Sequence, residues 1–287
     1  MRIARIFISG LMLASFCSHA ATTIDSVNRS AYGANVGWMD WVADTNNGAV
    51  VGEYVCSGYI YSANVGWINL GSGSPANGIQ YQNNSGTDFG VNQDGLGNLT
   101  GYAYGANIGW VNFESNGAPQ VNLINGQMSG YVWSANCGWI SLSNAVAYVQ
   151  TDAVLPGALA PDGLPVAWLL TYFGTTNVDP NADPTGKGMT IVQDYLAGTD
   201  PNNTNSVLEI TGGNFSFDGT NVMLTWESVP TRYYHILETP SLSPPAWTDS
   251  GLGVIPPSAN STTTAEFTDT MAPLRFYRIQ AVRPLIP

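Results

Sequence analysis

The chain has 287 residues and a formal net charge of −12, with 8 Lys and Arg against 20 Asp and Glu. Nucleic-acid surfaces and anionic membranes bind proteins through clustered cations, so this composition argues against both partners. The 32 glycines and 17 prolines are typical of a turn-rich β protein. We therefore expect a mainly β fold.

The first twenty residues have the layout of a secretory signal peptide. Arg2 and Arg5 give a positive start, an apolar run covers 6–16, and the small residues Ser18 and Ala20 precede the expected cleavage point. The run is shorter than the roughly 20 residues that cross a bilayer. We expect residues 1–20 to be removed, which leaves a secreted, extracellular or periplasmic protein without membrane insertion and with a net charge of −14.

Two cysteines, Cys56 and Cys137, and a single histidine, His235, remain after that cleavage. An oxidising compartment permits a disulfide between the cysteines, and two buried free thiols are the alternative. A zinc site needs three or four converging His and Cys ligands, which this set does not readily supply. No Gly-x-Ser-x-Gly elbow accompanies His235, so the sequence does not indicate a serine hydrolase.

The first half of the chain contains four copies of one motif, aromatic-x-Ala-Asn-x-Gly-Trp. The copies span 32–38, 61–67, 104–110 and 133–139. A shift of 72 residues places the first two copies on the last two without any insertion between them. The unit is therefore a pair of segments that has been duplicated.

Each copy of the motif predicts a β-hairpin. Asn and Gly suit tight turns, and the aromatic residues on either side favour strands. Four hairpins can close on themselves, so we expect 24–150 to form one compact domain, a small barrel or sandwich. Within it, 31–71 and 103–143 should be related by internal pseudo-symmetry.

The repeated Trp and Asn residues have two interpretations. In the structural one, which we favour, each Asn bonds its own turn and each Trp is covered, so Trp67→Ala or Trp139→Ala costs about 3–5 kcal/mol. In the functional one, exposed Trp faces stack on sugars and Asn contacts hydroxyls. Strand alternation puts Trp67 and Asn69 on the face opposite Ile68 and Leu70, so the Trp side is either a covered second layer or an open platform. The candidate glycan-contact residues are Trp38, Trp67, Trp110, Trp139, Asn35, Asn64, Asn107 and Asn136.

This Gly-Tyr-x-Trp/Tyr-Ser/Gly-x-Asn-x-Gly-Trp-Ile pattern resembles a short repeat found in many secreted bacterial proteins. The resemblance covers roughly residues 30–145. It implies export and does not imply an activity.

A helical connector is predicted after the repeats. Residues 151–165 are rich in Pro, Gly and Ala and predict a linker. Within the connector, 166–204, one helical pattern covers 167–173, and a second runs from Met189 to Leu196 and stops before a glycine.

The connector resembles the calcium-binding thrombospondin type 3-like and EF-hand-like segments of secreted bacterial proteins. Their common ending, Tyr-Leu-Ala-Gly-Thr-Asp-Pro, is matched at 195–201. An EF-hand loop needs oxygen ligands at positions 1, 3 and 5 and a glycine at position 6. Counting from Asp183 puts Lys187 at position 5, and counting from Asp179 puts Pro184 at position 6. Calcium is the cofactor implied, but we favour a metal-free hairpin and expect chelators to change the melting temperature little. The candidate ligands are Asp179, Asn181, Asp183 and Asp194.

Residues 207–284 alternate in short segments separated by Gly, Pro and Asn, which predicts a β-sandwich. The segment Leu224-Thr-Trp226, with Tyr234 and the closing run 275–279, resembles a fibronectin type III-like module. That resemblance implies a spacer or attachment unit.

These features favour a non-enzymatic modular protein of the cell surface or extracellular matrix that contacts glycans, with polysaccharides or surface proteins as partners. The alternative is a secreted carbohydrate-active hydrolase that uses two carboxylates of the repeat domain. The duplication argues against it, since Asp40 aligns with Asn112 and Glu53 with Asn125. The acids available to such a hydrolase are Asp40, Asp44, Glu53, Asp88 and Glu114.

Overall fold

The computed structural model shows a mainly β chain, as predicted. The chain divides into two compact units, which are described separately: a first unit that comprises residues up to 178 with 284–286, and a second unit, 179–283. The predicted signal peptide lies outside the described residues. Those residues are 22–43, 46–113, 116–215, 221–269 and 274–286.

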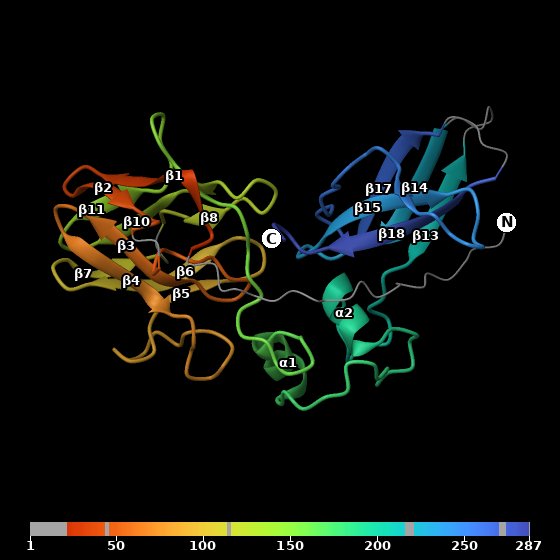
Figure 1. The fold of residues 1–287 in the computed structure, drawn as a ribbon, viewed down its shortest axis with the longest axis horizontal. Helices are drawn as coiled ribbons and strands as arrows, with labels where there is room; N and C mark the ends of the chain where they lie inside the picture. The colour runs from red at the N-terminus through yellow and green to blue at the C-terminus, as the bar shows by residue number, and fades with distance from the viewer. Residues whose placement is uncertain (1–21, 44–45, 114–115, 216–220, 270–273, 287) are drawn as a thin grey trace. The chain divides into compact units, whose positions relative to one another are not determined.

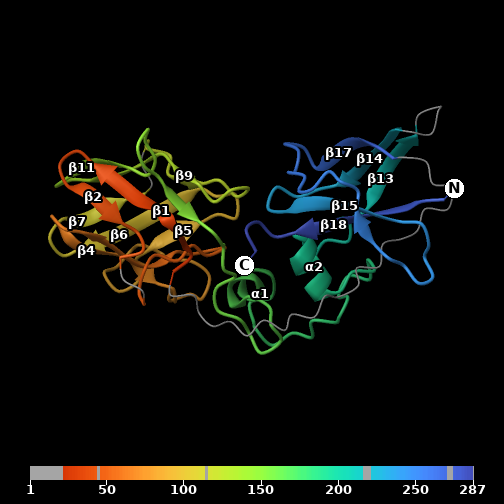
Figure 2. The same ribbon diagram turned by 45° about the horizontal axis from the view of Figure 1, so that its top comes forward.

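Eight strands of the first unit form a closed barrel built from four hairpins (Figures 1 and 2). Each hairpin pairs antiparallel with the next one, and the last strand pairs back to the first, with Tyr32 opposite Ser141. Of the two arrangements expected from the sequence, a small barrel or a sandwich, the structure has the barrel. The hairpins are β1 (Ile24–Gly33) with β2 (Gly37–Asp40), β3 (Ser57–Ser62) with β4 (Gly66–Ser72), β6 (Leu99–Gly105) with β7 (Gly109–Asn112), and β10 (Tyr131–Ser134) with β11 (Gly138–Ser141).

Short strands extend the barrel sheet at two places. β5 (Val91–Gln93) pairs with β6, and β12 (Val149–Thr151) pairs with β1. β8 (Gln120–Val121) and β9 (Met128–Ser129) form a separate two-stranded ribbon. These additions lie outside the closed path of the four hairpins.

The duplication seen in the sequence is also a repeat of structure. The bounds of β2 and β7 differ by 72 residues. A backbone hydrogen bond recurs with the same shift: Trp41 N donates to Arg29 O and Phe113 N to Gly101 O, both at 2.9 Å. Two side-chain bonds recur with the same shift, from Ser62 Oγ to Val36 O (3.4 Å) and from Ser134 Oγ to Ile108 O (3.3 Å).

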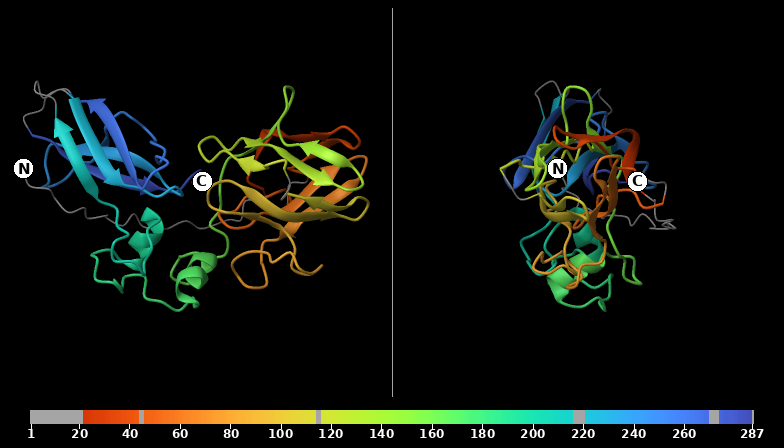
Figure 3. Two further views of the ribbon diagram at one scale, coloured as in Figure 1. Left: turned by 180° about the vertical axis from the view of Figure 1, so that it is seen from behind. Right: turned by 90° about the vertical axis from the view of Figure 1, so that its left-hand side faces the viewer.

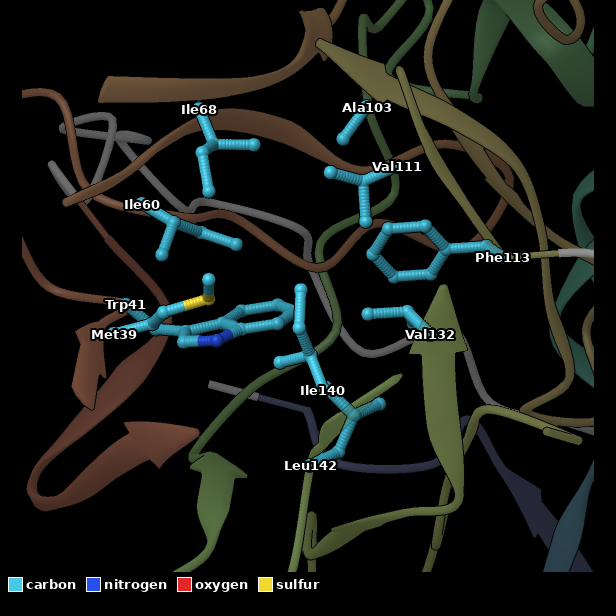
Figure 4. A pocket seen from close by; sticks show the side chains of 10 residues that line it. All are labelled: Met39, Trp41, Ile60, Ile68, Ala103, Val111, Phe113, Val132, Ile140 and Leu142. Atoms are coloured by element: carbon cyan, nitrogen blue, oxygen red, sulfur yellow. The ribbon is translucent and has the colours of Figure 1, made fainter. Parts of the chain in front are cut away.

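Alternation along the strands fills the barrel interior with apolar side chains. In β3, Ile60 is buried between two exposed tyrosines, and in β4 Ile68 is buried beside an exposed Trp. Figure 4 shows these side chains converging from several strands. The space left among them is about 10 Å³, roughly the volume needed for one water molecule. The interior is lined by Met39, Trp41, Ile60, Ile68, Ala103, Val111, Phe113, Val132, Ile140 and Leu142.

The turn of each hairpin contains Ala-Asn-x and is followed by a glycine whose backbone is in the left-handed conformation. The φ values are 75° at Gly37, 77° at Gly66, 72° at Gly109 and 74° at Gly138. Residues with a Cβ rarely adopt this conformation, which accounts for the glycine before every repeat Trp.

Two short helices are present among the described residues, close to where the sequence predicted them. α1 (Val166–Phe173) ends at Gly174 and belongs to the first unit, whereas α2 (Ile191–Ala197) belongs to the second. A capping box of Thr190 and Gln193 starts α2. Neither helix has the length and apolar character needed to cross a membrane.

The second unit contains two three-stranded sheets that share one core, visible as two layers in Figure 3. The core joins Trp226 and Leu224 of one sheet to Tyr234 and Ile279 of the other, and Met189, next to α2, packs against them. The sheets are β13 (Ile210–Phe215), β14 (Asn221–Glu227) and β17 (Thr262–Thr268), and β16 (Thr248–Asp249), β15 (Tyr233–Thr239) and β18 (Phe276–Val282).

Candidate functional site

The outer face of the barrel carries four cross-strand aromatic pairs, one in each hairpin. In every pair, the next-to-last residue of the first strand lies directly opposite the Trp that is the second residue of the following strand. We call this set the aromatic belt. It consists of Tyr32 with Trp38, Tyr61 with Trp67, Tyr104 with Trp110, and Trp133 with Trp139.

The belt is exposed, so the prediction that the repeat tryptophans are covered is wrong. Their exposed fractions lie between 44% at Trp110 and 50% at Trp38. The alternation argument did place Trp67 opposite the buried Ile68. No element of the described chain buries the belt, since both members of every pair remain exposed. The open platform is therefore the arrangement found.

Each of the four repeat tryptophans makes a ring contact with a tyrosine of its own hairpin. The ring centroids of Tyr61 and Trp67 are 5.0 Å apart, and those of Tyr32 and Trp38 are 4.9 Å apart. Trp67 also meets the ring of Tyr59 edge-on at 6.1 Å. Such tilted and edge-on contacts are favourable for aromatic pairs. Each of the four repeat tryptophans therefore packs against its hairpin on one side and exposes about half of its surface to solvent.

A polar residue lies two positions after each of the four repeat tryptophans, on the same face of the strand. Asp40 lies opposite Tyr61 of the next hairpin, and Asn69 lies opposite Tyr104. Around the barrel, aromatic pairs therefore alternate with polar side chains that can exchange hydrogen bonds. The four polar positions are Asp40, Asn69, Asn112 and Ser141.

The repeat asparagines join neighbouring hairpins, and the prediction that each bonds its own turn is wrong. Each side-chain amide donates to the carbonyl of the residue before the turn glycine in the preceding hairpin, and the first hairpin completes the circle with the fourth. The four bonds therefore form a closed ring at the turn end of the barrel. They run from Asn35 to Cys137 O, Asn64 to Val36 O, Asn107 to Val65 O and Asn136 to Ile108 O, each 3.0 Å long.

The carboxylates proposed for a hydrolase have structural partners where the structure describes them. Asp40 pairs with Arg29 at 3.3 Å, and Asp88 accepts hydrogen bonds from the backbone N–H groups of Ala76 and Gln82. Asp44 and Glu114 lie outside the described residues. These contacts give the hydrolase alternative no support.

The single histidine outside the signal region, His235, bridges two strands of the second unit. Its Nδ1 lies 2.7 Å from Asp249 Oδ2, which joins β15 to β16. Partial burial acts to raise the pKa of Asp249, but the hydrogen bonds from His235, Gly251 and Gly253 outweigh it and hold that pKa below its ordinary value. The pair therefore fastens the edge of a sheet.

The two cysteines are free thiols, so the disulfide considered from the sequence does not form. Both Cys56 and Cys137 are buried. Burial raises the pKa of Cys56 to about 12, with a backbone hydrogen bond at Gly52 acting against it. This thiol is thus kept protonated and unreactive at neutral pH.

The four candidate calcium ligands do not converge. Asp179 accepts from the backbone N–H of Asn181 in a local turn, and Asp183 accepts from the N–H groups of Lys187 and Gly188. Asp194 is buried on α2, and its Oδ1 lies 2.8 Å from Lys187 Nζ. Burial raises the pKa of Asp194, while its bonds to Lys187 and Thr199 act in the opposite direction. The Lys187 ammonium therefore already pairs with Asp194, the buried carboxylate among the four candidates. These residues do not fit a calcium ion.

No protein-family model, curated protein or solved structure that was compared matches this chain. The candidate site is therefore defined by its own geometry. The sequence identified the four motif tryptophans as candidates but not their cross-strand partners, Tyr32, Tyr61, Tyr104 and Trp133. Their position six residues before each Trp in the motif was the available signal.

Proposed function

We propose that this protein is a secreted, non-enzymatic binding protein whose aromatic belt takes neutral polysaccharide. The observation that carries the proposal is the exposure of all four aromatic pairs of the belt on the outside of a closed barrel. Exposed aromatic residues held in place by their neighbours are typical of binding surfaces, because they offer a large contact area at little cost in conformational entropy.

The surroundings of the belt support a sugar rather than a nucleic acid as the ligand. Sugar rings have an apolar face that stacks on an aromatic plane and hydroxyls that bond polar side chains, which the belt offers in alternation. The chain has 20 acidic residues against 8 Lys and Arg, which disfavours polyanions. The asparagine amides are engaged in the ring at the turn end, so the proposed surface consists of the belt and its polar neighbours.

Four equivalent positions around one barrel favour a multivalent mode of binding. Each pair offers a small area, and single sites of this kind bind weakly. A long polysaccharide or a crowded matrix presents many copies of one sugar unit, so engaging several pairs raises the overall affinity without new contacts. The duplication of the hairpin pair is what supplies these copies.

Export is part of the proposal and rests on residues 1–20. Expression of the full chain in a bacterial host should give a mature protein that begins at residue 21 in the culture medium or periplasm. Recovery of the intact chain from the cytoplasm would contradict this part of the proposal.

The belt is tested by replacing tryptophans in symmetry-related pairs. Trp38→Ala/Trp110→Ala, Trp67→Ala/Trp139→Ala and the fourfold variant would be compared with the unaltered protein on an array of neutral polysaccharides. Each double variant should lose at least about 10-fold in apparent affinity, and the fourfold variant should lose binding, because avidity falls with each lost site.

The matched control is Leu96→Ala, which removes an exposed apolar side chain of the same unit outside the belt. It should leave binding unchanged. Each Trp→Ala change lowers stability, so circular dichroism must show that every variant is folded at the temperature of the binding assay. A fourfold variant that is folded and binds as well as the unaltered protein would refute the proposal, as would an unaltered protein that binds none of the glycans.

A further inference from the structure

The side chain of Lys187, the chain's single lysine, is buried in the second unit. Its ammonium lies 2.8 Å from Asp194 Oδ1, and both side chains are at most 2% exposed. Three backbone carbonyls also accept from it: Asp200 O at 2.6 Å, Ser206 O at 2.9 Å and Asn203 O at 3.3 Å. Four oxygens from α2 and the loop after it thus converge on one nitrogen.

Local backbone geometry directs this lysine inwards. Gly186 and Gly188, on either side of it, have φ values of 70° and 88°. The carboxylate of Asp183 accepts from the backbone N–H groups of Lys187 and Gly188, at 3.2 and 2.7 Å. The turn is therefore fixed by the backbone, and the side chain projects from it towards Asp194.

The loop that supplies the carbonyls is arranged around the same point. The backbone N–H of Asp200 donates to Ser206 Oγ at 2.9 Å, and this bond joins the two ends of the loop. Thr199 Oγ1 donates to Asp194 Oδ1 at 2.5 Å. Carbonyl dipoles that converge in a buried place repel one another unless a positive group lies between them. The ammonium is that group.

This set of oxygens is also the donor set that hard cations prefer, a carboxylate with backbone carbonyls. Asp194 Oδ2 is buried and has no hydrogen-bond partner in the described part of the chain, so the carboxylate has a second oxygen to offer. The site differs from a metal site in one respect, because its cation is covalently part of the protein.

We infer that the Lys187 ammonium is a built-in cation that occupies an oxygen-lined cation site, so that this loop keeps its structure without free metal. The loop leads into Leu208, and Met189 lies two residues after the lysine. Both residues belong to the buried core of the second unit. Loss of the ammonium should therefore destabilise the sandwich as well as the loop.

The first experiment uses the unaltered protein. Because Lys187 is the single lysine, an amine-reactive acetylating reagent can modify only this residue and the N-terminus. We expect Lys187 to be protected in the folded protein and modified in urea, as read by peptide mass spectrometry. The melting temperature should be the same in EDTA as in CaCl₂ at about 5 mM. A tightly bound ion would raise the stability by mass action at this concentration.

The second experiment removes the ammonium in the full chain. Lys187→Met keeps most of the side-chain volume, and Lys187→Ala leaves space for an ion. Both should lower the melting temperature of the second unit by about 10 °C or more, since a buried carboxylate loses its partner. Lys187→Ala should regain stability, saturably, with Ca²⁺ or methylammonium, and Lys187→Met should not. Arg29→Met, which breaks an exposed ion pair in the first unit, is the control and should change little.

The inference is supported if a small cation restores the melting temperature of Lys187→Ala, or if this variant folds only when the cation is present. Lys187→Ala that responds to no added cation refutes it, as does Lys187→Met with unaltered stability. A rise of many degrees in the unaltered protein with Ca²⁺ would also refute it, because the site would then hold a free metal.

Discussion

The side-chain amide of Asn35 donates to the backbone carbonyl of Cys137, 102 residues further along the chain. This bond joins the turn of the first hairpin to the turn of the fourth. The three bonds between the other neighbouring turns have the same length, 3.0 Å. The motif asparagine is thus a connector between repeats, and the ring that it forms is complete only when all four hairpins are present.

Removing one member of the ring should weaken the barrel. We expect Asn64→Ala to lower the free energy of unfolding by about 0.5–1.5 kcal/mol, the usual net value of one hydrogen bond. Asn64→Asp should cost at least as much, because it keeps the size but loses the N–H donor. Urea unfolding followed by Trp fluorescence measures both.

The control for the ring is Asn84→Ala, an exposed asparagine of the same unit, which should change stability by less than about 0.5 kcal/mol. If Asn64→Asp proves as stable as the unaltered protein, the amide bond to Val36 O does not contribute to stability.

Neighbouring residues on one strand should differ in their effect on stability. Ile68 is buried in the barrel interior, so Ile68→Ala should cost about 2–5 kcal/mol. Trp67 is 45% exposed, so Trp67→Ala should cost about 1 kcal/mol, despite the larger side chain. Urea unfolding of the two variants measures both costs. Equal costs would mean that the belt is packed as tightly as the interior.

The thiols should be inert in the folded protein. Cys56 and Cys137 are buried, and burial raises the pKa of Cys56 to about 12, so little thiolate exists at pH 8. Alkylation by iodoacetamide should be at least about 100-fold slower in the native state than in urea, since it requires opening of the barrel. Mass spectrometry of each cysteine peptide measures the rates. Fast native labelling of Cys56 would contradict its burial, and a mass change on reduction would reveal a disulfide.

Acid should weaken the second unit through Asp249. Its pKa is lower in the folded protein, so the carboxylate contributes stability above its unfolded pKa of about 3.9 and loses that contribution as the pH falls through the folded value. We expect the urea midpoint of the second unit to fall as the pH drops below about 4. The fall should be shallower in Asp249→Asn, which has no charge to lose. Parallel curves for the two proteins would show that the pair with His235 makes no pH-dependent contribution.

The hairpins were predictable because their signals are local. Asn and Gly mark the turns, and the period-2 alternation of Ile68 and Trp67 assigns them to opposite faces. What covers the Trp face depends on distant parts of the chain, and alternation carries no information about it. The ring was missed for a related reason: the acceptor of Asn64 is a backbone carbonyl, which every residue has.

The connector shows the opposite limitation. Comparison with a calcium loop treats Lys187 as a defect, because a cationic side chain occupies a ligand position. In the structure, this residue supplies the positive charge itself, and its partners are Asp194 and three carbonyls outside the loop template. A template built from ligand positions cannot represent a cation that is part of the chain.

Closure of the barrel has a kinetic consequence. β11 pairs with β1, so the first and last hairpins must meet before the sheet is complete, and this loop must close across most of the first unit. Contacts between residues so far apart in the sequence form slowly, since the entropy of the intervening chain is lost first. Until then the growing sheet has two open edges, to which other chains can pair. A chain that stops before residue 131 should therefore aggregate rather than form a smaller barrel.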